Sequence, residues 1–272
     1  MIKVFCATHP ESGRFKDWYS DVSIIGNRSA VPDNIDLLIL TGGSDIDPKK
    51  YGGDTSLAYD VDPKRDEEEM TILDIVLNTT HAKVLGVCRG MQLLTVYYGG
   101  KLFGDLGKMG SSHTSVHDLK HIAKSPMDWL TTVNSLHHQG IATLIGSSRL
   151  LAIEPTTEIP EAVLYHDRIL GVQFHPEMFG VKTGNRFFSM ITDWVMNNTP
   201  MAEKWIPPTI SYTMDFTTGD APNTIWTTIG DGIMAVPMPM NAPPELEIQA
   251  DPTLNTGVGD WDHDQDDHEE EE

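Results

Sequence analysis

The chain is predicted to fold as an α/β three-layer sandwich, with helices on both faces of a central, mostly parallel sheet. Short apolar segments rich in Ile, Leu and Val alternate along the sequence with segments whose apolar residues recur at helical spacing. This alternation is typical of parallel strands joined by helical crossovers. Strands are expected at residues 2–7, 36–40, 84–87, 150–153, 162–165 and 169–174, and helices at 65–80, 91–98 and 185–197.

The 272 residues change in character near residue 200. Of the net charge of −21, residues 201–272 carry −15 and residues 1–200 only −6, and eight of the 17 prolines follow residue 200. We therefore predict an α/β domain at 1–200 and a Pro-rich extension at 201–258, followed by an acidic, disordered tail at 259–272. Within the extension, short strands are expected at 209–216 and 224–229 and an extended stretch at 236–244. The tail is interpreted as solubilising, with a docking segment for a protein partner as the alternative.

Composition argues against several classes of protein. No apolar run reaches the ~18 residues that a membrane span requires, and the first seven residues are too short for a signal peptide. Two cysteines, Cys6 and Cys88, do not make a disulfide framework, so a cytoplasmic location is expected and Cys6 is interpreted as core packing. Residues 1–200 contain no basic patch, so we expect no nucleic-acid partner and no membrane contact.

The most informative segment places Cys88 in a turn between an apolar strand and a helix. Gly86 and Gly90 stand two residues before and after it. Gly-x-Cys-x-Gly in this setting is typical of a nucleophile elbow, with a thiol in place of a hydroxyl. The glycines remove Cβ clashes from the strained turn, and the following helix favours a thiolate at its amino end. The alternative is a buried core cysteine beside two incidental glycines.

Two further segments supply partners for Cys88. His175 ends an apolar segment and precedes Pro176 and Glu177, so its imidazole can act as the base while Glu177 orients it. The alternative for such a histidine is a capped or solvated side chain. The backbone N–H of Arg89 and a turn at Gly42 and Gly43 would supply the oxyanion donors, although a Gly-Gly pair also occurs in ordinary turns.

These segments together resemble class I glutamine amidotransferases and, in detail, their gamma-glutamyl-gamma-aminobutyrate hydrolase branch. The resemblance covers about residues 1–198 and rests on four blocks, at 40–52, 65–106, 133–139 and 171–177. It implies a flavodoxin-like sheet and a catalytic triad of Cys88, His175 and Glu177, with Gly43 and Arg89 at the oxyanion. It also implies that substrate is bound by Gly42, Gln92, His137, His138 and Gln139. Because His137 and His138 are adjacent, only one of them is expected to face the pocket.

The function implied by the resemblance is hydrolysis of γ-glutamyl amide bonds through a γ-glutamyl thioester on Cys88. The alternative is a glutaminase subunit that supplies ammonia to a separate synthetase, and a third hypothesis is a non-catalytic interaction protein. The expected partner is a small γ-glutamyl substrate, with a homodimer or a protein partner for the tail as further expectations. No cofactor is expected.

Other polar patterns are interpreted as structural. His113, His117 and His121 have the four-residue spacing of metal ligands on a helix, but the segment is a poor helix former, so no metal site is expected. Asp45 and Asp47 are interpreted as loop caps. The acids at positions 67–69 are interpreted as favouring a helix dipole.

Overall fold

An eight-stranded sheet forms the centre of the fold in the computed structural model, with the strand order β2-β1-β3-β4-β12-β11-β10-β7. The structure describes residues 2–7, 10–20, 22–109, 113–145, 148–202, 224–229 and 232–237. The strands of this sheet are β1 (Val4–Ala7), β2 (Val22–Ile25), β3 (Leu37–Leu40), β4 (Lys83–Val87), β7 (Lys120–His121), β10 (Arg149–Ile153), β11 (Pro160–His166) and β12 (Ile169–Val172). The described residues contain three α-helices, which are α1 (Pro63–Thr79), α2 (Arg89–Tyr97) and α3 (Val181–Asn197).

The sheet has a parallel part and an antiparallel part. Strands β2, β1, β3, β4 and β12 run parallel, whereas β12, β11, β10 and β7 pair antiparallel. The boundary between the two parts is β12, which pairs with β4 on one side and with β11 on the other. The carboxyl ends of β4 and β12 therefore lie side by side, which brings the residues after Val87 and after Val172 together.

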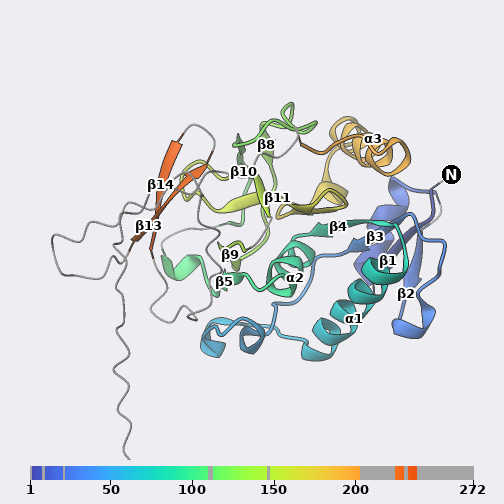
Figure 1. The fold of residues 1–272 in the computed structure, drawn as a ribbon, viewed down its shortest axis with the longest axis horizontal. Coiled ribbons are helices and arrows are strands. Elements are labelled where there is room, and N and C mark those ends of the chain that lie inside the picture. Colours follow the sequence, from blue (N-terminus) through green and yellow to red (C-terminus); the bar gives the residue numbers. More distant parts are fainter. Residues whose placement is uncertain are drawn as a thin grey trace, which may run out of the picture. The chain divides into compact units, whose positions relative to one another are not determined.

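Helices cover both faces of the sheet, which confirms the predicted three layers (Figure 1). Along β3, Leu37 and Ile39 belong to one core cluster, and Leu38 and Leu40 belong to the other. This alternation is the period of two expected for a strand buried on both faces. The first cluster includes Phe187, Phe188, Ile191 and Trp194 of α3. The second includes Ile72, Leu73 and Val76 of α1 and Leu93 and Leu94 of α2.

The helices begin where the sequence supplies suitable residues. Asp62 precedes α1 and accepts a hydrogen bond from the N–H of Arg65, while Pro63 occupies the first helical position. Helix α3 packs closely through Gly184, because a Cβ there would lie 2.1 Å from the ring of Trp18. Asn198 ends α3 in the left-handed conformation, with φ of 51°.

Most predicted elements of the α/β domain are present, with ends shifted by a few residues. The strand predicted at 169–174 ends at Val172. Strand β2 was not predicted. Two small sheets also escaped prediction: β5 (Lys101–Phe103) pairs with β9 (Gly140–Thr143), and β6 (His117–Asp118) pairs with β8 (Thr132–Val133).

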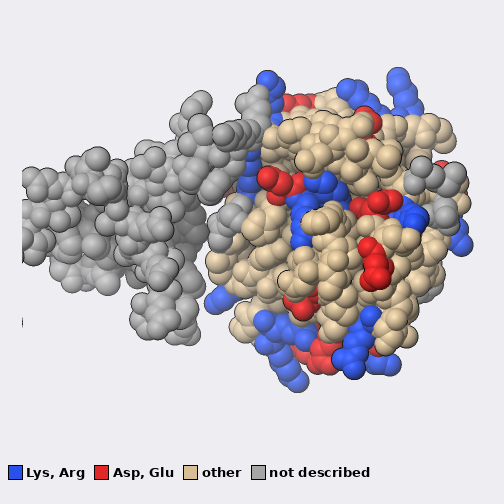
Figure 2. Space-filling view, turned by 45° about the vertical axis from the view of Figure 1, so that its right-hand side comes forward, with Lys and Arg blue, Asp and Glu red and all other residues tan. Residues whose placement is uncertain are grey.

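The extension contains β13 (Thr224–Ile229), as predicted, and β14 (Gly232–Pro237), and the two form their own sheet. The predicted strand at 209–216, the extended stretch beyond residue 237 and the acidic tail lie outside the described residues. No helix among the described residues is long and apolar enough to cross a membrane. On the face shown in Figure 2, basic and acidic side chains are interspersed among neutral ones.

Candidate active site

Cys88 lies in a strained turn between β4 and α2, as the elbow interpretation predicts. Its backbone has φ of 51° and ψ of −107°, a left-handed φ that a residue with a Cβ adopts only where the surroundings impose it. A Cβ on Gly90 would lie 2.1 Å from the carbonyl oxygen of Leu40, and one on Gly86 would lie 2.7 Å from that of Gly90. The turn therefore requires both glycines. The Cys88 N–H donates to the carbonyl of Val172 at 2.8 Å, which holds the turn against β12.

His175 and Glu177 make the contact expected of an oriented base. Nδ1 of His175 lies 2.7 Å from Oε1 of Glu177, and both residues are buried. Because a carboxylate only accepts, the proton lies on Nδ1, and Nε2 is free of hydrogen-bond partners among the described residues. Burial lowers the pKa of His175, but interactions with Cys88 and Glu177 outweigh it and raise this pKa to about 11. The imidazole is therefore held in its protonated form beside the thiol.

Two amide side chains position these groups, and the sequence interpretation gave neither of them a role. Gln173 donates through Nε2 to Sγ of Cys88 at 3.6 Å. Asn134 bonds the backbone of His175 twice, donating to its carbonyl at 2.9 Å and accepting from its N–H at 2.8 Å. Gln173 precedes His175 by two residues, so strand periodicity contained a signal for it. Asn134 lies in the 133–139 block that carries the family resemblance, but no local pattern indicates that it contacts His175.

The two predicted oxyanion donors have backbones suited to the task. Gly43 has φ of 138°, which residues with a Cβ rarely adopt, and a Cβ there would lie 2.2 Å from Nη1 of Arg65. Arg89 is the first residue of α2, so its N–H has no intrahelical acceptor. Assignment of these N–H groups to an oxyanion stays a prediction.

A buried network of two arginines and two carboxylates lies behind this turn. The Arg89 guanidinium pairs with Asp66 and with Glu69 of α1. Arg65 pairs with Glu69 at 2.9 Å, and its Nη2 donates to the carbonyl of Gly42 at 2.9 Å. The network thus ties the elbow and the Gly42–Gly43 turn to one helix. The dipole interpretation of the acids at 67–69 is wrong for Glu69, which is fully buried in this network.

The residues predicted to bind substrate separate into two groups. Gln92 donates to the carbonyl of Gln139 at 3.1 Å, and Gln139 in turn accepts from the N–H of Ile46 at 3.2 Å. These two residues hold the loop after β3 and the loop before β9 to the nucleophile helix. Their contact with substrate stays a prediction, as does that of Gly42, whose carbonyl is held by Arg65.

His137 and His138 point in different directions, as expected for adjacent residues on an extended backbone. His138 is half-buried and lies 2.8 Å from the carboxylate of Asp45, with its ring stacked on Tyr59 at 4.2 Å. His137 is buried and faces Glu161, with its Nε2 at 3.8 Å from Oε1. Asp47 caps a 3-10 turn by accepting from the N–H of Lys49, which confirms the capping interpretation for that residue.

His113 and His117 do not lie on a helix; instead, they join His137 and Glu161 in a second buried cluster. Nδ1 of His113 lies 3.8 Å and Nε2 of His117 lies 3.6 Å from Oε1 of Glu161. Burial is the main cause that lowers the pKa of His113 and of His137 to about 4. His121 lies elsewhere, with Nε2 at 2.8 Å from the carbonyl of Leu130.

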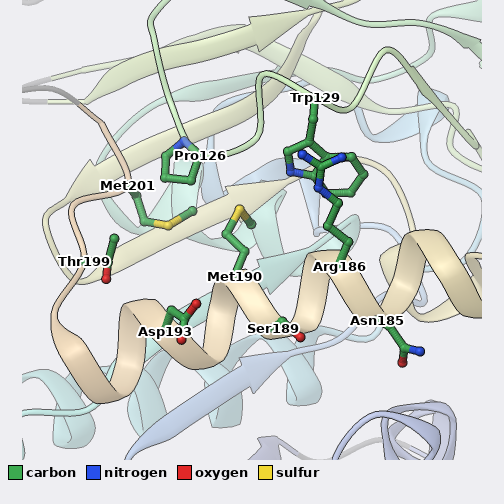
Figure 3. A pocket seen from close by; sticks show the side chains of 9 residues that line it. All are labelled: Pro126, Trp129, Asn185, Arg186, Ser189, Met190, Asp193, Thr199 and Met201. Carbon is green, nitrogen blue, oxygen red and sulfur yellow. The ribbon is translucent and has the colours of Figure 1, made fainter.

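A cavity of about 520 Å³ beside α3 shares no residue with the triad (Figure 3). Arg186 lies over the ring of Trp129 at 4.2 Å along one side of it, and Met190 and Met201 lie along another.

Cys6, the other cysteine, is buried, and burial raises the pKa of its thiol to about 12. Among the described cysteines, Cys88 is therefore the one with reactive surroundings.

Comparison with known proteins shows the family to which this chain belongs. The Peptidase C26 family model matches residues 26–177. The glutamine amidotransferase-like protein YvdE of Lactococcus lactis is 33% identical over 160 residues, which cover 53% of this chain and 66% of YvdE. The glutamine-hydrolyzing GMP synthase of Fusobacterium nucleatum is 27% identical over 135 residues, covering 49% of this chain and 25% of the synthase. The chain thus spans less than two thirds of either relative.

The solved structure of a glutamine amidotransferase from Thermotoga maritima has the same fold, with a TM-score of 0.50 at 15% identity over 72% of this chain and 85% of that one. The fold is that of the class I glutamine amidotransferases. The chain belongs to the Peptidase C26 family, among the glutamine amidotransferase-like proteins.

Proposed function

We propose that the protein hydrolyses γ-glutamyl amide bonds, with Cys88 as nucleophile. The observation that carries this proposal is the pairing of a cysteine in a strained elbow with a buried imidazole whose second nitrogen is fixed by a carboxylate at 2.7 Å. This arrangement supports an acyl-transfer triad of Cys88, His175 and Glu177. The γ-glutamyl specificity is supported by the resemblance of the Gln92 and residue 133–139 segments to the gamma-glutamyl-gamma-aminobutyrate hydrolase branch.

In the proposed reaction, the Cys88 thiolate attacks the γ-carbonyl carbon and the carbonyl oxygen becomes an oxyanion. The N–H groups of Gly43 and Arg89 bind this oxyanion. The C–N bond then breaks, and His175, already protonated, gives its Nε2 proton to the leaving amine. The product at this stage is a γ-glutamyl thioester and a free amine.

In the hydrolysis of the thioester, His175 acts as a base, whereas in the first half of the reaction it acts as an acid. The now neutral His175 takes a proton from water, and the hydroxide oxygen attacks the thioester carbonyl. The C–S bond breaks, glutamate leaves, and Cys88 returns as a thiolate beside the protonated imidazole. Glu177 keeps the ring oriented throughout, and Gln173 stabilises the sulfur by donating a hydrogen bond.

A glutaminase subunit that delivers ammonia to another chain is the second candidate. The match to part of GMP synthase favours it, because that relative's name describes glutamine hydrolysis. The two candidates differ in the amine released and in their need for a partner.

A substrate screen separates the candidates. The purified chain is given glutamine and the γ-glutamyl derivatives of GABA, putrescine and several amino acids, and glutamate release is measured. The hydrolase is expected to turn over at least one γ-glutamyl amine faster than glutamine without a partner. Faster glutamine hydrolysis, stimulated by a second protein, would favour the glutaminase.

Cys88→Ala and Cys6→Ala make a matched pair for the nucleophile. Loss of Cys88 is expected to lower kcat by roughly 10⁴-fold or more, the size seen when a nucleophile is removed. Cys6→Ala removes a thiol from the core and should leave kcat within about threefold, because Cys6 has no part in the proposed reaction. Equal losses in both variants would contradict the proposal.

A further inference from the structure

We propose that His113, His117, His137 and Glu161 form a binding site for a divalent transition-metal ion, with Zn²⁺ as the best match. Ligand atoms of His113, His137 and Glu161 all lie within 4.8 Å of one another, and all three residues are buried. His117 reaches the group through Glu161, at 3.6 Å. This site is separate from the Cys88 chemistry and does not depend on the proposed function.

The four residues come from segments that the fold brings together. His113 bridges to His137, and His117 lies on β6, which pairs with β8 just before the His137 loop. Glu161 lies on β11 and accepts through its carbonyl from the N–H of Gln173 at 2.9 Å. The site is therefore built on hydrogen-bonded backbone rather than on one flexible loop.

Each imidazole uses its outer nitrogen for a hydrogen bond that leaves a lone pair facing Glu161. Nδ1 of His137 lies 2.8 Å from the carbonyl of Gln139, and Nδ1 of His117 lies 2.9 Å from that of Asp118. A carbonyl only accepts, so both protons are on Nδ1 and both Nε2 atoms are unprotonated in the neutral ring. This pattern, an outer N–H donated to a carbonyl, is usual for histidines that ligate metals.

His113 follows the same pattern with its nitrogens exchanged. Its Nε2 lies 3.4 Å from Oγ1 of Thr157, and that hydroxyl donates to Glu154 at 2.6 Å. The hydroxyl hydrogen is thus committed to Glu154, so Thr157 accepts the proton of Nε2. Nδ1 of His113 then presents its lone pair to Glu161.

The inner atoms of this cluster are left without hydrogen bonds. Nδ1 of His113, Nε2 of His117, Nε2 of His137 and both carboxylate oxygens of Glu161 have no hydrogen-bond partner among the described residues. Buried polar atoms are normally satisfied, and five together are costly. One proton on Glu161 would satisfy a single nitrogen, whereas one cation at the centre satisfies the whole group.

The spacing and the ligand types favour zinc. Ligands placed 2.0–2.1 Å from a tetrahedral ion lie about 3.4 Å from one another. The three nitrogens lie 3.6–3.8 Å from the same oxygen, Oε1 of Glu161, and the ligand atoms of His113, His137 and Glu161 lie within 4.8 Å of one another, so the imidazoles would have to close inward onto the ion. Three neutral imidazoles and one carboxylate suit Zn²⁺ better than Ca²⁺ or Mg²⁺, which prefer oxygen ligands.

Three of these residues form the compact group, and with His117 drawn in as a fourth ligand the ion would have no open position and would act as a structural centre. It would fix the 133–139 segment, whose Asn134 holds the backbone of His175. The ion would thereby anchor the loop that positions the base, without contacting substrate.

The test is metal retention by the full chain. Protein is stripped with a chelator, loaded with Zn²⁺, dialysed and analysed for metal by mass spectrometry. We expect about one Zn²⁺ per chain in the wild type, and at least about tenfold weaker binding in His113→Ala and in Glu161→Gln. His121→Ala is the matched control, because His121 lies in the same segment but outside the cluster. Cys88→Ala should also retain the ion.

Co²⁺ absorption provides a readout in the wild type that requires no variant. A four-coordinate site of nitrogen and oxygen ligands gives strong visible bands, which Zn²⁺ should abolish in proportion to its binding. Failure of the wild type to retain Zn²⁺, a weak six-coordinate Co²⁺ spectrum, or equal retention in Glu161→Gln and His121→Ala would each overturn the proposal.

Discussion

The arginine–carboxylate network and the histidine–glutamate cluster both lie in the interior, yet only the first pairs opposite charges directly. In the network, two guanidiniums meet two carboxylates through direct ion pairs. In the cluster, three imidazole lone pairs face one carboxylate, and its oxygens accept no hydrogen bond from the described residues. The network holds its charges by direct pairing, whereas the cluster leaves the inner atoms of its imidazoles and of Glu161 without hydrogen-bond partners among the described residues. The difference separates the part of the molecule that holds the elbow from the part that we propose binds an ion.

The largest effect is expected on breaking the arginine–carboxylate network. Arg89→Ala leaves Asp66 and Glu69 buried without the guanidinium that pairs with both, so the free energy of unfolding should fall by roughly 3–5 kcal/mol. Urea denaturation followed by circular dichroism measures this loss.

Lys50→Ala provides the control. The Lys50 ammonium lies as far as 3.9 Å from the carboxylate of Glu67, and Glu67 is exposed to solvent. Its effect should stay below about 1 kcal/mol. Similar losses in the two variants would mean that the network is not the scaffold of the elbow.

A smaller effect is expected on the protonation of His175. Burial lowers its pKa, but Cys88 and Glu177 raise it to about 11, so Cys88→Ser should lower this pKa by about 1–3 units. A raised pKa stabilises the fold fully below the unfolded value near 6.5 and loses that contribution as the pH rises through about 11. Cys88→Ser should therefore lose stability at neutral pH.

Proton NMR of the His175 ring against pH measures this shift. Cys6→Ser is the comparison, since Cys6 is not among the groups that shift this pKa. A His175 pKa near 6.5 in the wild type would contradict a protonated imidazole at rest.

The smallest effect is expected in the metal-free histidine–glutamate cluster. Burial raises the pKa of Glu161 to about 8, and Glu161→Gln replaces this carboxyl with an amide of the same shape, whose N–H groups can donate to the facing imidazoles. In chelator, the free energy of unfolding should therefore change by no more than about 1 kcal/mol, in the stabilising direction. With Zn²⁺ present, the wild type should instead be the more stable. A loss in chelator as large as that of Arg89→Ala would show that the cluster is already complete without an ion.

The sequence predicted the parts of the molecule that depend on local pattern. Apolar periodicity located the main strands and helices of the α/β domain, because each is buried on a face whose period the sequence repeats. The elbow at Cys88 and the His175–Glu177 contact could also be predicted, since glycine spacing and a two-residue separation are local features. Strand β2 was missed because it is only four residues long and Ser23 interrupts its apolar residues.

The clusters required knowledge of the fold. His113, His137 and Glu161 are distant in sequence and meet only because short strands pair. The spacing of His113, His117 and His121 is that of metal ligands on a helix. In the structure, however, the pairing of short strands brings His113 and His117 together. The sequence grouped Glu69 with two neighbouring acids that favour a helix dipole, whereas the fold buries Glu69 beside Arg65 and Arg89.

The most direct test of the proposed chemistry is to trap the acyl-enzyme. Wild-type protein is mixed with a γ-glutamyl amide, quenched in acid after a few milliseconds and digested, and the peptides are weighed by mass spectrometry. The account predicts one γ-glutamyl group on the peptide that contains Cys88, with none on the Cys6 peptide and none in Cys88→Ala. Turnover that continues in Cys88→Ala, or an adduct that survives there on another residue, would contradict it.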